Sequence, residues 1–322
     1  MKYFENNVLA LMPCAVKVPM EATIASYIKN KNLSLKYEIL SNAVVQADFF
    51  EELKTIEDID KLPDIMIAPG FSRFFFPAFV ERFIKKGAFQ SSLDFEVSEA
   101  YQESGVIDPN AYYDIIAVNP LIFLVDQTNY PDLEPPKKWA DLLSSQYQQK
   151  IAFRGHTDED LCEGILFEIY HTHGIEGIER LARNIKSRLH PSQMVALAGS
   201  KKEEAPFISV IPLSFANLVK ESDTVRVIWP EDGAVMNPVV MLTKKDCSQD
   251  AKDVSRYFIS EAVGALFSEV GFCSLRPGLE ERMPHFGKYK WIGWDFLLQT
   301  DVKKLHDELN QVVNTHSLER VK

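Results

Sequence analysis

Two apolar runs of strand length meet at a proline in YYDIIAVNPLIFLVD, residues 112–126. Proline has no N–H group to donate to a sheet ladder, and it biases the residue before it toward extended backbone. The break at Asn119-Pro120 is therefore a place where a chain can pass from one sheet to another. We predict that the first run closes one β-sheet and that the second run opens a different one.

Upstream of this segment, strand-like runs alternate with helix-length patterns. Strands are expected in NVLALMPC, LSLKYEIL and DIMIAPG, and helices in VPMEATIASYIKN, FFEELKTIEDIDK and PAFVERFIKKG. Short β-rich runs separated by helices are typical of parallel strands that are covered by helices on both faces. We predict an α/β fold of two Rossmann-like lobes with mixed, mainly parallel sheets joined by hinge strands.

A second α/β series follows the proline. We expect a helix around PKKWADLLSSQYQ, a strand in KIAFRG, helices in DLCEGILFEIYHTHG, IEGIERLARNIKSRL and SQMVALAG, and a strand in PFISVIPLS. Two strand-like pieces flank a PEDG turn in VRVIWPEDGAVMNPVVMLTKK, and helices follow in 248–271 and 302–313. A return crossing near 230–238 divides the chain into a discontinuous first lobe, 1–118 plus 232–322, and a second lobe, 119–231.

Two of these segments resemble a known family. PPKKWADLLSSQYQQKIAFRG is similar to the P-x-x-W-x-D-L and y-x-x-k-I-a segment of the family 1 solute-binding proteins of ABC transporters. VRVIWPEDGAVMNPVVMLTKK resembles the returning segment of that family, in which a P-E-D/E-G turn leads to an apolar strand. The resemblance implies the type II periplasmic-binding fold, in which two hinged lobes hold a small molecule between them. It also implies an ABC permease as a partner and a protein that is not an enzyme.

The candidate ligand-binding site follows from the fold class. Ligands of open α/β sheets lie beyond the carboxyl ends of strands, where helix N-termini present free N–H groups. The loops after the predicted strands therefore supply the candidates, with one more residue at the returning crossing. They are Cys14, Lys17, Gly70, Phe71, Ser72, Arg73, Arg154, Gly155, His156, Thr157, Asp158, Glu159, Ser214, Phe215 and Asp232.

The stretch GFSRFFF, residues 70–76, allows two interpretations. A flexible glycine, a hydroxyl and a guanidinium beside aromatic rings suit an anionic group next to a planar wall. Alternatively, Ser72 caps a helix, Arg73 is solvated and the phenylalanines are core. If the first interpretation holds, the ligand carries an anionic group that Ser72 and Arg73 bind.

The stretch RGHTDED, residues 154–160, presents carboxylates after a predicted strand. Thr157 and Asp160 have the spacing of a capping pair at a helix start. The carboxylates either stabilise the positive end of that helix or meet a cationic end of the ligand. The second alternative predicts an amphoteric solute such as an amino-carboxylate or an aminophosphonate.

No metal and no cofactor are expected. The resembling family contains ferric-ion binders that use adjacent tyrosines in the second-lobe loop, where this chain has Ser214-Phe215. His171 and His173 precede Gly174, and they are interpreted as a helix end because H-x-H alone lacks a third ligand. The chain has no GxSxG, HExxH, P-loop or GxGxxG motif, so standard catalytic signatures are missing.

The apolar run VLALMPCAV, residues 8–16, is interpreted as a buried first strand. An export signal needs a basic start, whereas Glu5, Asn6 and Asn7 precede this run. As the chain stands we expect a cytoplasmic protein, and an extracytoplasmic one if a leader has been removed. Cys14 lies within this run, after its first five residues and Pro13, and is interpreted as an inert thiol or as a ligand contact or nucleophile.

Charge limits the partners. Lys and Arg number 35 against 46 Asp and Glu, a net charge of -11, which repels nucleic acid at long range. We expect a monomer that binds a small polar solute, amphoteric or anionic, as the receptor of an ABC-type uptake system. A cytoplasmic ligand-sensing module of the same fold and an enzyme that uses Cys14 and His156 are the alternatives.

Overall fold

The computed structural model describes residues 5–41, 53, 55–71, 74–155, 162–279 and 285–318. The chain forms two compact units. Unit 1 comprises Met1–Val118, Asn237–Met283 and Gly293–Asp301, and unit 2 comprises Asn119–Met236, Pro284–Ile292 and Val302–Lys322. No described helix is long and apolar enough to cross a membrane.

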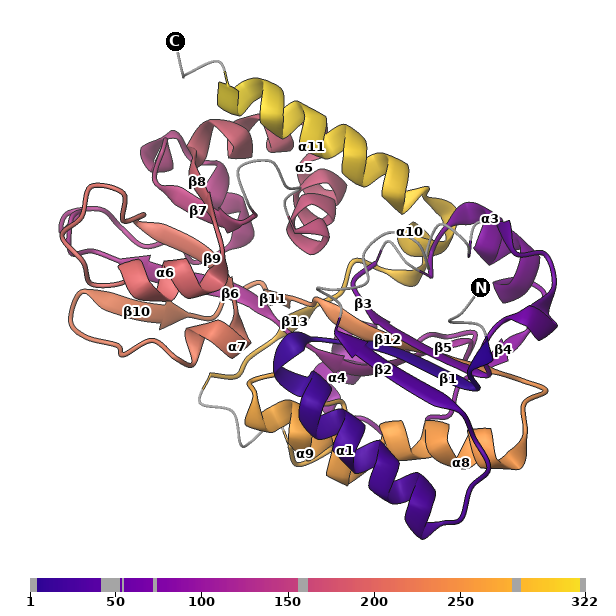
Figure 1. Ribbon diagram of the computed structural model, residues 1–322. Coiled ribbons are helices and arrows are strands. Elements are labelled where there is room, and N and C mark those ends of the chain that lie inside the picture. Colours follow the sequence, from indigo (N-terminus) through magenta and orange to yellow (C-terminus); the bar gives the residue numbers. More distant parts are fainter. Residues whose placement is uncertain are drawn as a thin grey trace. The chain divides into compact units, whose positions relative to one another are not determined.

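Unit 1 alternates strands and helices, as Figure 1 shows. Its elements are β1 (Val8–Met12), α1 (Cys14–Asn30), β2 (Tyr37–Ser41), η2 (Ile59–Lys61), β3 (Ile65–Pro69), α3 (Pro77–Phe79), η3 (Val80–Ile84), β4 (Phe89–Gln90), α4 (Glu99–Ser104), β5 (Tyr113–Val118), β12 (Pro238–Lys244), α8 (Gln249–Phe258), α9 (Glu261–Glu269) and α10 (Trp294–Gln299).

The sheet of unit 1 has the order β2-β1-β3-β12-β4, and β5 also pairs with β12. β1 is parallel to β2 and β3, whereas β12 is antiparallel to its neighbours. Alternate residues of β1 face a core that α1, α8 and α9 close, and all five residues of β1 are buried. The first apolar run is therefore a strand buried on both faces, as predicted.

Aromatic rings fill another part of unit 1. Phe75 stacks on Tyr113 with ring centroids 4.9 Å apart, and the ring of Trp294 lies 5.3 Å from that of Tyr113. The neighbouring rings of Phe74 and Phe76 are also buried. The phenylalanines of GFSRFFF are core residues, as the second interpretation expected.

Unit 2 contains the remaining elements. They are β6 (Leu121–Asp126), η4 (Trp139–Leu143), η5 (Ser145–Tyr147), β7 (Ile151–Arg154), α5 (Glu163–Asn184), β8 (Ile185–Leu189), α6 (Pro191–Leu197), β9 (Ile208–Pro212), α7 (Leu213–Ala216), β10 (Val225–Ile228), β11 (Ala234–Val235), β13 (Tyr289–Lys290) and α11 (Val302–Leu318).

The sheet of unit 2 has the order β13-β11-β6-β9-β7-β8, and β10 also pairs with β6. β7 is parallel to β8 and β9, whereas β6 is antiparallel to β9. β5 and β6 belong to different sheets, so the chain changes sheets at Asn119-Pro120, as predicted. It returns between β11 and β12, and the crossing strands make both sheets mixed.

Two local predictions are wrong, and the two compact units differ in extent from the predicted lobes. IKSRL at the end of a predicted helix forms β8, because these residues pair with β7. The predicted helix around Trp139 is two short 3-10 turns. Residues 284–292 and 302–322 belong to unit 2, whereas the predicted lobe boundaries placed all of 232–322 in the first lobe.

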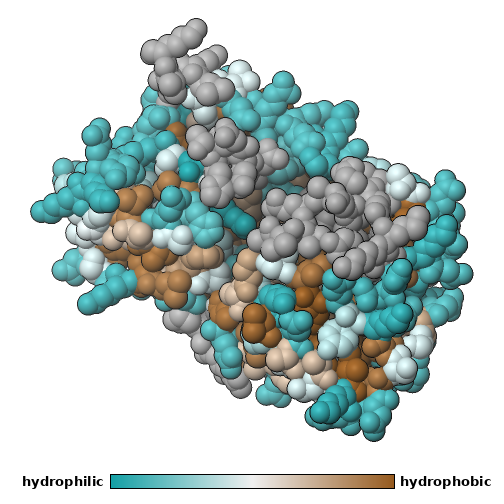
Figure 2. Space-filling model, in the orientation of Figure 1, coloured by the Kyte–Doolittle hydropathy of each residue, from teal (hydrophilic) through white to brown (hydrophobic). Residues whose placement is uncertain are grey.

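The last difference has a packing cause. α11 buries Val302, Leu305, Leu309 and Val313 at helical spacing and packs beside α5, where the ring of His306 lies 6.1 Å from that of Phe167. Its outer face is hydrophilic (Figure 2). The amphipathic pattern predicts a helix with one buried face, but it does not say which unit covers that face.

Candidate functional site

In unit 1, the carboxyl ends of parallel strands bring together side chains from two loops. Met12 pairs with Ser41, so the residue after β1 and the last residue of β2 are neighbours. The Cys14 Sγ and Ser41 Oγ atoms lie 3.0 Å apart, and Cys14 is exposed. This sheet edge carries a thiol and a hydroxyl at the start of α1.

The start of α1 is open to an anion. Pro13 is the N-cap residue, no side chain caps the helix, and its first turn contains no acidic residue. The N-terminus of a 17-residue helix carries a partial positive charge, which attracts anions. Lys17, another candidate, makes an ion pair with Glu21 along the helix, with Nζ and Oε2 2.5 Å apart.

Gly70 and Phe71 follow β3 and have structural roles. Gly70 has a φ angle of 89°, in the region that favours glycine, and its N–H donates to the Pro238 carbonyl over 2.9 Å. Phe71 is only 1% exposed, so its ring is part of the interior rather than of an open surface. Ser72 and Arg73 lie outside the described residues.

In unit 2, the ends of three parallel strands also converge. Arg154 is exposed at the end of β7, and the Gly155 N–H donates to the Leu189 carbonyl at the end of β8. The residue after β8 is His190, whose ring packs edge-on against Phe215 with centroids 5.7 Å apart. The predicted loops after β7 and β9 therefore both lie next to the loop after β8, which contains His190.

His190 was not predicted as a site residue, because the residues before it were expected to form a helix instead of strand β8. Its Nδ1 accepts the Ser192 N–H over 3.2 Å and caps α6. In the neutral ring the proton is then on Nε2, which makes Nε2–H a donor. The sequence His-Pro-Ser, residues 190–192, could have indicated that His190 precedes a helix start, because proline is common at the first helical position.

Ser214 is held by a residue of the sheet crossing. Asn119 donates from Nδ2 to the Ser214 Oγ over 2.9 Å, and Asn119 Oδ1 accepts the Ser214 N–H over 3.2 Å. Asn119 is 7% exposed, and this pair of hydrogen bonds fixes the start of α7 relative to β6. Asn119 is therefore a positioning residue behind the candidate ligand contact Ser214, and this role of Asn119 was not predicted from the sequence.

Asp232 links the two motifs that carry the family resemblance. Its carboxylate accepts the Trp139 N–H over 3.3 Å, and the Trp139 indole donates to the Gly233 carbonyl over 2.7 Å. Lys290 also lies 3.4 Å from the Asp232 carboxylate. These contacts give Asp232 a structural role in joining the W-x-D segment to the PEDG turn.

The acidic turn lies outside the described residues. His156, Thr157, Asp158 and Glu159 belong to it, and so does Asp160 of the proposed capping pair. The following helix, α5, begins at Glu163 and has non-helical backbone at Gly174, just after His173. Among the described residues, no three His, Cys, Asp or Glu side chains are grouped to hold a metal ion.

The family of the chain follows from its sequence. Residues 60–300 match the model of a family described as bacterial extracellular solute-binding protein. The chain therefore belongs to this family, whose members bind solutes and are not enzymes. The predicted resemblance to solute-binding proteins is confirmed. No curated protein matches the chain.

Solved structures confirm the fold. The apo ferric ion-binding protein A of Pasteurella haemolytica aligns with a TM-score of 0.63 and 13% identity, covering 98% of each chain. The IdiA (FutA) protein of Trichodesmium, solved with iron and citrate ligands, aligns at 0.64 and 14% identity over 96% of this chain and 98% of its own. An ABC transporter protein of Clostridium perfringens aligns at 0.62 and 16% identity over 96% and 99%. The predicted type II periplasmic-binding fold is confirmed.

Proposed function

We propose that this chain is the solute-binding component of an ABC-type uptake system and that strand-end loops of both units hold a small polar solute. The family membership supports solute binding. The observation that carries the proposed site is that side chains of neighbouring loops meet where parallel strands end, Cys14 with Ser41 in unit 1 and His190 with Phe215 in unit 2. An ABC permease is the proposed partner.

The chemistry at these edges favours an anionic group on the solute. α1 has no acidic residue in its first turn and no side-chain cap, so its positive end is not neutralised from within the helix. Arg154 and the Nε2–H of His190 add donors in unit 2. We propose that Arg73 with Ser72 binds the anionic group and that Asp158 and Glu159 meet a cationic end, as in an amino-carboxylate or aminophosphonate.

A solute screen tests this proposal. Amino acids, aminophosphonates and simple oxyanions are compared by thermal shift, because a ligand selective for the folded state raises the melting temperature. Arg73→Ala should then weaken binding of the best solute at least about tenfold, since a charge-assisted hydrogen bond contributes about 1.5–3 kcal/mol. Arg256→Ala is the matched control, because that arginine is 54% exposed on α8 in the same unit.

Two outcomes of this screen contradict the solute proposed. Equal affinity of Arg73→Ala and the wild type in calorimetry would remove Arg73 from the site. If sulfate or phosphate stabilises the protein strongly while the amphoteric solutes do nothing, the acidic turn is only a helix cap. Thermal unfolding of each variant without solute shows whether the change acts through folding instead.

Ferric iron is a second candidate solute, because similar structures include proteins described as ferric ion-binding. The described residues of this chain argue against it, since Ser214 and Phe215 stand where the family's iron binders have tyrosines. Titration with ferric citrate while recording the visible spectrum distinguishes the two. A tyrosinate-to-iron absorption band would identify iron as the solute, whereas binding of an organic solute without such a band supports the first candidate.

We also propose an extracytoplasmic location, since the family is described as extracellular. The competing hypothesis is a cytoplasmic ligand-sensing module of the same fold. Fractionation of cells that express the complete gene separates the two, because a receptor for an uptake system must be outside the inner membrane. Recovery with cytoplasmic marker proteins would favour the sensing module.

A further inference from the structure

A buried asparagine determines how the hydroxyl group of Ser214 is used. Asn119 is 7% exposed, whereas Ser214 is half-buried, so Ser214 is the residue of the pair that a solute reaches. Asn119 Nδ2 lies 2.9 Å from the Ser214 Oγ, and Asn119 Oδ1 lies 3.2 Å from the Ser214 backbone nitrogen. The chemistry of these two contacts fixes the direction of both hydrogen bonds.

The backbone N–H of Ser214 sets the orientation of the amide. A backbone N–H can only donate a hydrogen bond, so the Asn119 atom that faces it is the oxygen. The reversed amide would place two donors, the Nδ2–H of Asn119 and the N–H of Ser214, against each other. The amide NH2 group therefore faces the Ser214 Oγ and donates to it.

The backbone around the pair holds the two residues at this distance. The neighbouring residues share a hydrogen bond of their own, from the Leu213 N–H to the Pro120 carbonyl over 2.8 Å. The strands on which these residues border, β6 and β9, are paired along their length. Asn119 therefore cannot turn away from Ser214 without loosening the start of α7.

This geometry leaves the Ser214 hydroxyl as a hydrogen-bond donor. Its oxygen already accepts from the amide, so the hydroxyl hydrogen points away from Asn119. Among the residues that the structure describes, no acceptor lies within hydrogen-bond distance of this hydroxyl. A solute oxygen that accepts would pair it, whereas a solute group with donors alone would leave it unpaired, at a cost in affinity.

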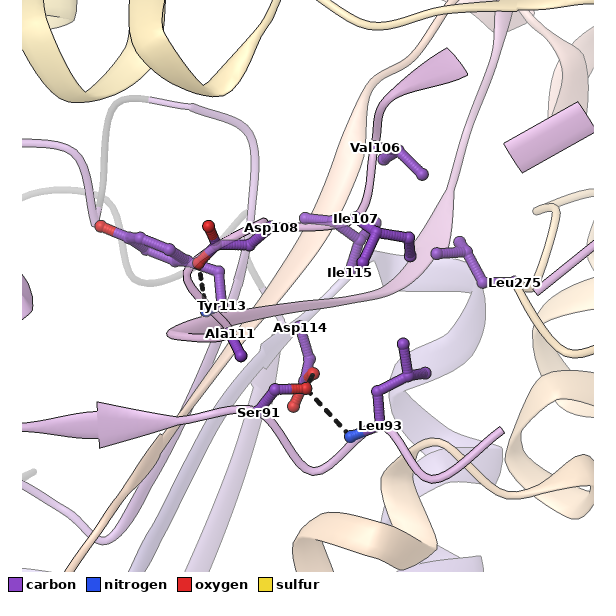
Figure 3. A pocket seen from close by; sticks show the side chains of 10 residues that line it. All are labelled: Ser91, Leu93, Val106, Ile107, Asp108, Ala111, Tyr113, Asp114, Ile115 and Leu275. Carbon is purple, nitrogen blue, oxygen red and sulfur yellow. Dashed lines mark hydrogen bonds between the residues drawn. The ribbon is translucent and has the colours of Figure 1, made fainter. Parts of the chain in front are cut away.

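Unit 1 contains the opposite arrangement, a serine beside a carboxylate (Figure 3). The Ser91 hydroxyl donates to the Asp114 carboxylate, and the Ser91 Oγ accepts the Leu93 N–H over 3.0 Å. Burial raises the pKa of Asp114 to about 6, so at pH 8 the carboxylate is ionised and can only accept. A carboxylate beside a serine thus takes up the hydroxyl hydrogen that an amide NH2 group leaves free.

We propose that Asn119 is a specificity-determining positioning residue, which sets the Ser214 hydroxyl as a donor to an acceptor oxygen of the solute, as in a carboxylate or a phosphonate. Asn119 acts through Ser214 and does not itself contact the solute. Arg154 is exposed at the end of β7, which pairs with β9, and it is a further donor on the same sheet edge. The inference rests on the proposed function and assigns an acceptor group of the solute to the loop after β9.

The substitution Asn119→Asp at pH 8 reverses the direction of the hydroxyl group. One aspartate oxygen still accepts the Ser214 N–H, and the other accepts the Ser214 hydroxyl, as the carboxylate of unit 1 does. Calorimetry uses glycine, aminomethylphosphonate and inorganic phosphate as probes. Each probe that binds the wild type should bind Asn119→Asp at least about tenfold more weakly, and Ser214→Ala should cause a comparable loss.

A double-mutant cycle separates this effect from the added charge and from a general loss of structure. If Asn119 acts through Ser214, the loss caused by Asn119→Asp should be at least about threefold smaller in a chain that already carries Ser214→Ala. A loss of the same size in both chains would overturn the inference. Circular dichroism checks that all three variants are folded.

Neutron diffraction from solute-free crystals of the wild type observes the hydroxyl group directly. The deuterium on the Ser214 Oγ should point away from Asn119, and the Asn119 ND2 group should face that oxygen. A deuterium directed at Asn119 would overturn the inference for any solute. If the wild type binds none of the three probes while the deuterium points away, the proposed solutes are contradicted and the role of Asn119 is supported.

Discussion

Asp114 shows how one residue couples burial to pH. Its carboxyl group is buried, and burial raises its pKa from 3.8 to about 6. The folded chain therefore holds the proton more tightly than the unfolded chain does. The sign of the linkage follows: protonated Asp114 favours folding at low pH, and this contribution is lost as the pH rises from about 4 through 6.

Asp114→Asn should remove this pH dependence, because the amide does not titrate. A difference of about two pKa units corresponds to about 3 kcal/mol. The unfolding free energy of the variant minus that of the wild type should therefore rise by about 2–3 kcal/mol between pH 4 and pH 7. Urea unfolding at a series of pH values measures this difference, and a difference that does not change with pH contradicts the assignment.

Gly233 is required both by its backbone conformation and by the lack of room for a side chain. Its φ angle is 104°, and a Cβ atom at this position would lie 2.9 Å from the carbonyl carbon and oxygen of Tyr289. Gly278 has a φ angle of 80° with nothing within 4 Å of its ideal Cβ. Alanine at Gly278 would introduce backbone strain alone, whereas alanine at Gly233 would introduce both backbone strain and a steric clash.

Gly233→Ala should therefore destabilise the chain by more than Gly278→Ala. Backbone strain alone costs on the order of 1 kcal/mol, and the clash with the Tyr289 backbone should add at least as much to Gly233→Ala. Urea midpoints of both variants test the difference. Equal losses would mean that β11 and β13 separate easily enough to admit a methyl group.

At the scale of elements, one lysine joins three segments of unit 2. Lys290 on β13 lies 2.7 Å from the Glu168 carboxylate on α5 and 3.4 Å from that of Asp232. Burial lowers the pKa of Lys290, but hydrogen bonds and the charges of Glu168 and Asp232 outweigh this and raise it. The Glu168 side chain is 7% exposed, and it also accepts a hydrogen bond from the Thr172 hydroxyl over 3.0 Å, so Lys290 is its cationic partner but not its sole one.

Lys290→Met should destabilise the chain by about 2–4 kcal/mol, since it leaves the buried Glu168 carboxylate without its cationic partner. Glu168→Gln combined with Lys290→Met should lose less than the sum of the two single changes, because the double variant no longer contains the uncompensated charge. Denaturant unfolding of the four proteins measures the coupling. Strict additivity would show that Lys290 and Glu168 do not stabilise one another.

Elements were predictable where local chemistry and tertiary contacts agree. The run 8–12 is apolar at every position and is buried on both faces. The sequence IKSRL contains good helix formers and no glycine or proline, yet it pairs with β7, because sheet pairing outweighs intrinsic propensity. His190 was missed for the same reason, since its position at a sheet edge depends on β8 being a strand.

At the scale of the whole molecule, the break at Asn119-Pro120 correctly predicted where the chain changes sheets. The positions of α11 and β13 were not predictable, because each is fixed by a partner distant in sequence, α5 and β11 respectively. Candidate loops after β1, β7 and β9 followed from the rule for strand ends. Whether their side chains are open or buried did not follow, as Phe71 shows.

The last prediction concerns closure of the two units around a solute. A solute that contacts loops of both units binds one arrangement more tightly than others and shifts the population toward it. A shift from 1:99 to 99:1 needs about 5.5 kcal/mol of differential affinity, which several charge-assisted hydrogen bonds supply together. Small-angle scattering should show a smaller radius of gyration when the solute that emerges from the thermal-shift screen is added. Arg73→Ala should need at least about tenfold more solute for the same compaction. If calorimetry demonstrates binding while the radius stays constant, the solute is held by one unit alone and the hinge hypothesis is wrong.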